Sequence, residues 1–143
     1  MTTLAARAIR EFYLGDMEDY PVVASDIIYE GAAVGENAAG YSRPLVAADP
    51  FQGFAIEGDV DNSAGAAGAK RVRVRTRGRI QLAVAGATAI TANDRPPVYA
   101  ADDDTFTLTA TSNSLIGYVS RWISSGVAIV EFDALAVKAA LQA

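Results

Sequence analysis

The chain has 143 residues, with 12 lysines and arginines, 17 aspartates and glutamates, a formal net charge of -5, and neither cysteine nor histidine. The missing residue types exclude disulfides, thiol catalysis, cysteine or histidine zinc sites and the commonest general base. A hydrophobic fraction of 51% with 20% charged residues predicts one folded domain with a sizeable core rather than a disordered chain.

Residues 1–25 are predicted to form an N-terminal arm. Apolar residues at helical spacing favour a short amphipathic helix over residues 3–14, with Gly15 as its C-terminal cap; they are Leu4, Ala8, Ile9, Phe12 and Tyr13. Residues 16–25 favour an extended arm or linker, so that the compact domain begins near Asp26. We expect neither a secretory signal nor a membrane span here, and the absence of disulfides fits folding in the cytoplasm.

From Asp26 onward the chain is predicted to be mainly β, because short β-branched or aromatic runs alternate with Gly, Asn, Asp and Pro clusters. The predicted strands are 26–30, 44–48, 53–57, 70–84, 97–100, 105–111, 115–122 and 126–132. Residues 31–40 and 59–68 are predicted as loops or turns. This pattern fits a small β-barrel or a β-sandwich over residues 26–133. Residues 134–143 form either a short helix capped by Asp133 or a tail.

The segment Lys70–Arg79 holds six of the twelve basic residues. On a strand, the five arginines at odd positions project from one face while Val72, Val74 and Thr76 project from the other. We expect one long bent strand, with Gly78 at a bulge or kink. The arginines have three conceivable partners: carboxylates or solvent on the protein itself, a neighbouring protein surface, or nucleic acid. The net negative charge and the lack of aromatic residues among the arginines disfavour nucleic acid.

Other motifs fail as catalytic or metal-binding sites. Asp59 begins a sequence like a calcium loop, but Ala64 and Lys70 stand where glycine and glutamate are required, so a turn is predicted. The run Asp102–Asp104 is predicted to be a hairpin turn rather than a cation site. The spacing of Gly53 and Gly58 resembles a phosphate-binding loop without the lysine that such a loop needs. The sequence therefore predicts no enzyme, no metal site and no cofactor.

Two aromatic residues fall on the predicted strand 115–122. Tyr118 and Trp122 occupy even positions together with Ile116, and this placement favours a core or a subunit interface over an aromatic platform for a ligand. Apolar side chains fall on both faces of this strand, so we expect it to be central in a sheet or covered.

Several segments in the second half of the chain form a distinctive series of strands and turns. They are Val72–Leu82, Pro97–Ala100, Phe106–Val119 and Gly126–Val130, and the sharpest is the threonine-rich strand followed by an Asn-x-x-Ile-Gly turn that ends at Gly117. This series resembles the small capsid cement, or head decoration, proteins of tailed phages over about residues 26–133. The first 25 residues lie outside the resemblance, and the arginine density at 70–79 exceeds what it implies.

The resemblance implies a β-rich protein that binds the outside of an assembled icosahedral head, often as trimers, and reinforces the shell. We therefore expect a homo-oligomer, made in the host cytoplasm, that binds the major capsid protein on the outer surface of the virion. The residues expected to contact the capsid or another protomer are Arg71, Arg73, Arg75, Arg77, Arg79, Phe12, Tyr13, Tyr118 and Trp122. Two alternatives stay open: a nucleic-acid-binding barrel that uses Arg71–Arg79, and a glycan-binding head-fibre module that uses Trp122 and Tyr118.

Overall fold

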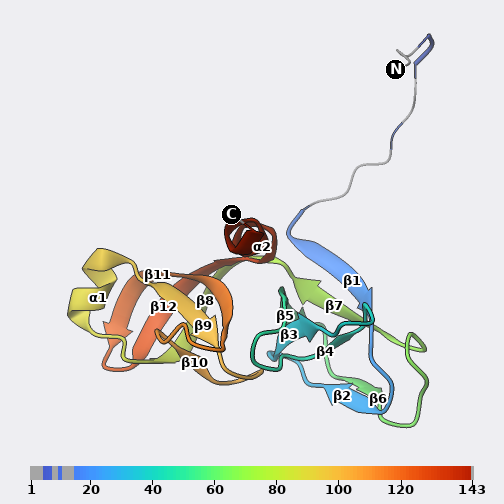
Figure 1. Ribbon diagram of the computed structural model, residues 1–143, viewed down its shortest axis with the longest axis horizontal. Helices are drawn as coiled ribbons and strands as arrows, with labels where there is room; N and C mark the ends of the chain where they lie inside the picture. Colours follow the sequence, from blue (N-terminus) through green and yellow to red (C-terminus); the bar gives the residue numbers. More distant parts are fainter. Residues whose placement is uncertain (1–4, 8–9, 11–14, 143) are drawn as a thin grey trace.

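The computed structural model describes residues 5–7, 10 and 15–142, and the helix expected over residues 3–14 falls largely outside them. The described chain is mainly β, as predicted, and contains a closed barrel, an open five-stranded sheet and a small two-stranded sheet. Figure 1 shows the barrel on the left and the open sheet on the right. Neither described helix is long and apolar enough to span a membrane.

The barrel is built from the second half of the chain. Its strands follow one another in the closed order β10-β8-β12-β11-β9, and every pair is antiparallel except the parallel pair β10–β8. Their bounds are β8 Arg77–Ala85, β9 Pro97–Ala100, β10 Phe106–Thr107, β11 Ser114–Ser124 and β12 Val127–Asp133. Closure of these five strands decides between the two expected architectures for this half of the chain in favour of a barrel.

The open sheet is built from the first half of the chain and has the order β1-β7-β5-β3-β4. Its strands are β1 Met17–Pro21, β3 Ala33–Glu36, β4 Ser42–Pro44, β5 Phe51–Ile56 and β7 Arg71–Arg75. The two short strands β2 (Asp26–Ile28) and β6 (Val60–Asn62) form a separate antiparallel pair. Just after β1, Val22 makes a parallel bridge to Ser42 of β4, and the Val23 N–H donates to the Ser42 carbonyl at 2.9 Å. The two edges of the sheet therefore meet at one end.

The strands β7 and β8 are separated by a single residue, Thr76, and together link the open sheet to the barrel. Val72 and Val74 are completely buried, while the arginines that alternate with them in β7 are exposed. This confirms the predicted alternation. The predicted strand 70–84 is thus divided at Thr76 and not at Gly78. Gly78 lies within β8 with a φ of 150°, a conformation that side-chain-bearing residues rarely adopt.

The hydrophobic core has two parts on opposite faces of β5. One part joins the barrel interior to the open sheet through four phenylalanine rings, with ring centroids 4.9 Å apart for Phe54 and Phe132 and 6.0 Å for Phe54 and Phe106. The other part packs Ala55 of β5 with Val34, Val72 and other residues on the far face of the sheet. Both β3 and β5 contribute to the two parts, since Ala33 and Phe54 belong to the first and Val34 and Ala55 to the second.

Two helices lie in the described chain. The helix α2 (Ala134–Gln142) follows β12 directly, and the Asp133 carboxylate accepts hydrogen bonds from the N–H groups of Leu135 and Ala136 at 3.1 and 3.2 Å. Of the two alternatives for residues 134–143, a capped short helix or a tail, the structure has the capped helix. The helix α1 (Ala89–Asp94), which the sequence analysis did not predict, ends at Arg95 in a left-handed conformation.

Four sequence-based expectations are corrected. Residues 16–25 are not a linker, because β1 pairs with β7 and Val22 is completely buried. The loops expected over 31–40 and 59–68 contain β3 and β6. Of the strand expected over 105–111, only β10 pairs with neighbours, although the alternation of Phe106 with threonines is regular. In each case pairing with distant strands, rather than local pattern, decides which residues form the sheet.

Candidate functional site

The candidate site predicted from sequence is the arginine row, defined as Arg71, Arg73, Arg75, Arg77 and Arg79. The centre of the row is paired with carboxylates of the same molecule. The Arg73 Nε lies 2.9 Å from Asp19 Oδ1 and 3.2 Å from Glu57 Oε2, and a second guanidinium nitrogen of Arg73 lies 3.2 Å from Asp19 Oδ2. Asp19 takes this position because β1 pairs with β7 so that Asp19 lies directly opposite Arg73.

Two further arginines of the row also face carboxylates. Arg79 Nε lies 2.9 Å from Oε1 of Glu131, the residue opposite it on β12, and Arg75 Nη1 lies 3.8 Å from Asp16 Oδ2. Arg71 donates to the Asp19 carbonyl at 3.4 Å. Within the described residues, Arg71 and Arg77 have no carboxylate within ion-pair distance. Of the three expected partners, carboxylates of the protein itself are thus observed for Arg73, Arg75 and Arg79.

The pairing changes the electrostatics of the row. The hydrogen bond from Arg73 holds the pKa of the Asp19 carboxyl below its ordinary value, and the same bond raises the pKa of the Arg73 guanidinium. Because these side chains stay largely exposed, each pair stabilises the fold only weakly. Three of the five arginines in the row are therefore paired with carboxylates of the same molecule, which reduces the positive charge that the row could offer to phosphates.

The two predicted aromatic site residues, Tyr118 and Trp122, project from opposite faces of β11. Tyr118 lies opposite Glu131 on the outside of the barrel and is 47% exposed. Trp122 lies opposite Ala128, which is completely buried, so Trp122 faces the barrel interior. A register shift between Val119 and Arg121 inserts one extra residue and reverses the alternation. The two rings therefore do not form one platform.

Three other predictions about sites have different outcomes. Phe12 and Tyr13 lie outside the described residues. The expected turn at Asp102–Asp104 is confirmed. The Asp104 N–H donates to the Asp102 carboxylate at 2.9 Å, and the Ala101 N–H donates to the Thr105 carbonyl at 2.8 Å. Burial, with the neighbouring Asp102 charge, raises the pKa of Asp103. In the part of the chain that the structure describes, no group of three acidic side chains is arranged to hold a metal ion.

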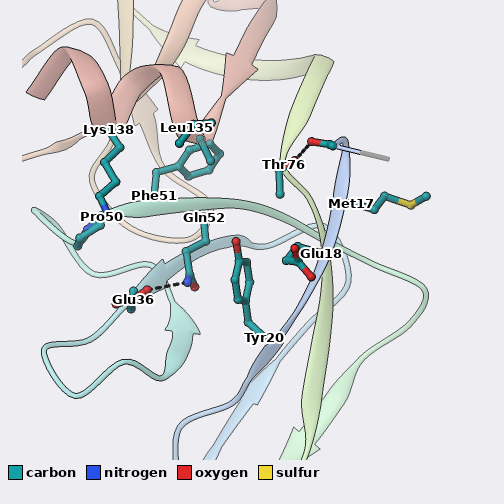
Figure 2. A pocket seen from close by; sticks show the side chains of 12 residues that line it. Met17, Glu18, Tyr20, Glu36, Pro50, Phe51, Gln52, Thr76, Leu135 and Lys138 are labelled. Carbon is teal, nitrogen blue, oxygen red and sulfur yellow. Dashed lines mark hydrogen bonds between the residues drawn. The ribbon is translucent and has the colours of Figure 1, made fainter. Parts of the chain in front are cut away.

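A hollow of about 320 Å³ lies where the start of β1, the strands β3 and β5 and the first turn of α2 meet, as Figure 2 shows. We call it the β1–α2 hollow. Burial raises the pKa of the Tyr20 phenol on its wall, and the charges of Glu18 and Glu36 add to the effect. On another wall, the Gln52 amide donates to the Glu36 carboxylate at 3.0 Å.

This hollow could not be predicted from the sequence, because its walls come from residues far apart in the chain. Only the pairing of β1 with the sheet, which the sequence did not predict, brings Tyr20 beside Glu36 and Gln52. The single local signal was Asp133, whose capping fixes where α2 begins and so places Leu135 and Lys138 at the rim.

No protein-family model, curated protein or solved structure matched this chain. The interpretation of the site therefore rests on the residues themselves. They offer paired surface charges, two aromatic residues on separate faces and a hollow in which the Gln52 amide binds the Glu36 carboxylate.

Proposed function

We propose that this protein is a tailed-phage capsid cement, or head decoration, protein. It binds the outer surface of the assembled head as a homo-oligomer, most simply a trimer, and stabilises the shell through contacts with the major capsid protein. The proposal rests on where the segments that resemble this class lie in the fold. Pro97–Ala100, Phe106–Val119 and Gly126–Val130 fall on β9, β10, β11 and β12, four adjacent strands of one closed barrel. The fourth segment, Val72–Leu82, runs from β7 of the open sheet into β8, so most of the resemblance, but not all of it, falls on the barrel.

The surface chemistry supports the proposal. A cement protein needs broad contact surfaces and no reacting groups, and arginine suits such contacts because its planar guanidinium pairs with carboxylates and tolerates loss of water. Arg71 and Arg77 are exposed, and no described carboxylate of the same molecule pairs with them. They are therefore the members of the arginine row assigned to acidic side chains on the shell or on a neighbouring protomer.

Oligomerisation supplies the strength that single contacts of this kind lack. An exposed charge pair contributes little by itself, but several protomers joined in one oligomer bind a repeated surface together and gain avidity without new chemistry. On this proposal the isolated protomer binds the shell weakly, and the oligomer binds it tightly.

The geometry weighs against both alternatives. Nucleic-acid binding through the arginine row requires Arg73, Arg75 and Arg79 to exchange their carboxylate partners for phosphates. A glycan platform requires Tyr118 and Trp122 on one face, whereas they project from opposite faces of β11.

The test of the proposal is binding to heads. Heads that lack this protein should bind the purified protein at a fixed copy number per major capsid protein, and the decorated heads should resist heat to a higher temperature than bare ones. The mass of the purified protein in solution gives the oligomer number. Heads with unchanged composition and thermal stability after addition of the protein would contradict the proposal.

A matched pair of variants tests the assignment of the two arginines. The double substitution Arg71→Gln with Arg77→Gln should weaken head binding strongly, because it removes the two guanidinium groups assigned to the shell or to a neighbouring protomer. The control, Arg73→Gln with Arg79→Gln, removes the same charge from arginines that already pair within the protomer and should weaken binding less. Equal losses would show that only net charge matters.

A further inference from the structure

Thr76 holds the two rims of the β1–α2 hollow at a fixed separation. Its N–H and its hydroxyl donate to the Asp16 and Gly15 carbonyls beside the start of β1, both at 2.9 Å. Its carbonyl accepts the Ala134 N–H at the start of α2, also at 2.9 Å. The hollow is therefore built into the backbone, and its volume of about 320 Å³ lies at the lower end of the range usual for ligand pockets.

Two carboxylates face the hollow from different strands. Figure 2 shows Glu18 of β1 on one side of the Tyr20 phenol and Glu36 of β3 on the other. Burial raises the pKa of this phenol and the charges of both glutamates raise it further, as expected for three groups around one space. Glu18 accepts the Asp19 N–H at 3.1 Å. Glu36 accepts the Gln52 amide at 3.0 Å, so each carboxylate keeps an oxygen that can accept a further hydrogen bond.

The charge of the lining is negative. Among the described residues, no lysine or arginine nitrogen lies within ion-pair distance of Glu18 or Glu36. Lys138 of α2 lines the hollow with one ammonium group, so two carboxylates stand against one cation. A positively charged occupant would therefore be stabilised beside the two glutamates.

The remaining side chains suit an apolar stem. Phe51 is 5% exposed and lines the hollow, and Leu135 of α2 stands at its rim with 77% of its surface exposed. We call Phe51, Leu135 and the neighbouring Met17 and Pro50 the apolar wall. Lysine and arginine side chains, like simple alkyl amines and guanidines, combine an apolar stem with a charged head that donates hydrogen bonds.

We infer that the β1–α2 hollow binds an organic cation, an ammonium or guanidinium group on an apolar stem, with its head between Glu18 and Glu36 and its stem along the apolar wall. The hydroxyl oxygen of Tyr20 lies between the carboxylates and adds a third acceptor for the head. A basic side chain of another polypeptide and a free alkyl amine or guanidine offer the same chemistry. The inference goes beyond the proposed function and does not depend on it.

Two probes of nearly the same shape test the inference. Propylguanidinium carries a positive charge on a short apolar stem, and propylurea has the stem without the charge. Each is titrated into the isotope-labelled full chain, where the NMR signals of the Gln52 side-chain amide, which binds Glu36, report occupancy of the hollow. Propylguanidinium should bind at least about fivefold more tightly, because two charge contacts distinguish the probes. Equal affinities, or Gln52 signals that do not move, would overturn the inference.

Substitutions locate the binding. Glu18→Gln with Glu36→Gln should remove the preference for the charged probe, and Lys138→Gln should increase it, because a competing ammonium group is lost. The control, Asp94→Asn with Asp104→Asn, removes the same charge at exposed positions outside the hollow and should leave the preference unchanged. Circular dichroism reports whether each variant keeps its fold. A preference that survives the first double substitution, or that falls equally in the control, would overturn the inference.

A third probe separates the two sources of the cation. N-acetylarginine amide presents the guanidinium group and its stem with a peptide group on each side, as a polypeptide would. Binding at least as tight as that of propylguanidinium would support the site and assign it to a side chain of another polypeptide. Binding of propylguanidinium alone would support the site and assign it to a free amine or guanidine, and binding of neither probe would overturn the inference.

Discussion

The barrel and the open sheet solve the same problem of strand edges in different ways. Every strand of the barrel has two hydrogen-bonded neighbours, whereas β1 and β4 each have one within the open sheet. The edge of β1 is instead protected by its own side chains. The Asp19 N–H donates to the Glu18 carboxylate at 3.1 Å, and Pro21 has no N–H to offer. Closure protects the barrel by topology, and the open sheet relies on particular residues.

This difference bears on how the protein associates with others. A free strand edge recruits other strands without selectivity, but the protected edge of β1 disfavours such pairing. Contacts with a shell or with another protomer are therefore expected through side chains, above all those of the arginine row. Substitutions at the contacts between and within the two regions should show how far each region depends on the other.

Replacing Phe132 should destabilise both regions together. Phe132 of β12 is 2% exposed and contacts Phe51 and Phe54 of the open sheet, so Phe132→Ala should lower the free energy of unfolding by about 3–5 kcal/mol. Urea unfolding monitored by circular dichroism and by Trp122 fluorescence should still give a single transition. The control Ile123→Ala, at a 37% exposed position, should change stability by less than about 0.5 kcal/mol. Two separate transitions would show that the barrel folds without the sheet.

The ion pair between Arg43 and Asp49 tests the open sheet at its β4 edge. Two guanidinium nitrogens of Arg43 bind the two oxygens of Asp49 at 2.9 and 2.8 Å, and Asp49 is only 8% exposed. Arg43→Gln should therefore cost about 1.5–3 kcal/mol in urea unfolding. A loss no larger than that of Arg73→Gln, whose partners are exposed, would contradict the importance given to burial.

Gly117 tests the barrel at a point where two strands approach closely. A Cβ added there would lie 2.0 Å from the Glu131 carbonyl oxygen and 2.8 Å from the Phe132 Cα. Since the closed barrel leaves little room for β11 and β12 to separate, Gly117→Ala should cost about 1–3 kcal/mol. Gly15→Ala is the control, because its Cβ would meet only Arg77 at 3.8 Å. A fully stable Gly117→Ala variant would mean that the strands can move apart.

The pair of Asp19 with Arg73 gives a smaller effect that depends on pH. Because the folded state lowers the pKa of Asp19, the stabilisation is present above its ordinary value of 3.8 and is lost as the pH falls through the lowered value. Asp19→Asn should therefore reduce stability at pH 7 and have a smaller effect near pH 2. High salt should also reduce the difference at pH 7, since the pair is exposed. A difference that stays constant with pH would remove the charge interaction as its cause.

The smallest expected effect is a gain in stability at the barrel turn that contacts the sheet. Burial and the Asp102 charge raise the pKa of Asp103, so the ionised form destabilises the fold at neutral pH, and stability recovers as the pH falls through the raised value. Asp103→Asn should increase the melting temperature slightly at pH 7 while keeping the hydrogen bond from the Ala33 N–H to the residue 103 carbonyl, which is 2.9 Å long. A decrease would indicate that the carboxylate has a stabilising partner.

The sequence predicted the barrel better than the open sheet. Strand 97–100 was predicted with its observed bounds, and 126–132 was displaced by one residue, because β-branched and apolar residues dominate both. The strands β1, β3 and β6 were missed since Met17–Pro21, Ala33–Glu36 and Val60–Asn62 are rich in acidic residues, glycine or proline. Such residues become strands only because distant partners complete their hydrogen bonds.

The candidate site was predicted in part. The alternation of arginine and valine at 71–75 follows directly from the period of a strand, and the structure bears it out. Which carboxylates pair with the arginines depended on β1 and β12, and therefore on tertiary structure. The expectation that Tyr118 and Trp122 share a face was wrong, because a one-residue bulge between Val119 and Arg121 has no signature in the sequence and reverses the side chains as far as Trp122.

Thr76 has a mechanical consequence. Its N–H holds the Asp16 carbonyl, where the N-terminal segment enters, and its carbonyl accepts the Ala134 N–H, where the C-terminal helix starts. A pulling force applied to either terminus therefore acts on the same residue, between β7 and β8, through the peptide units on its two sides. A force applied to both termini would therefore act along the strands next to Thr76 and would not separate the strands one after another from an end.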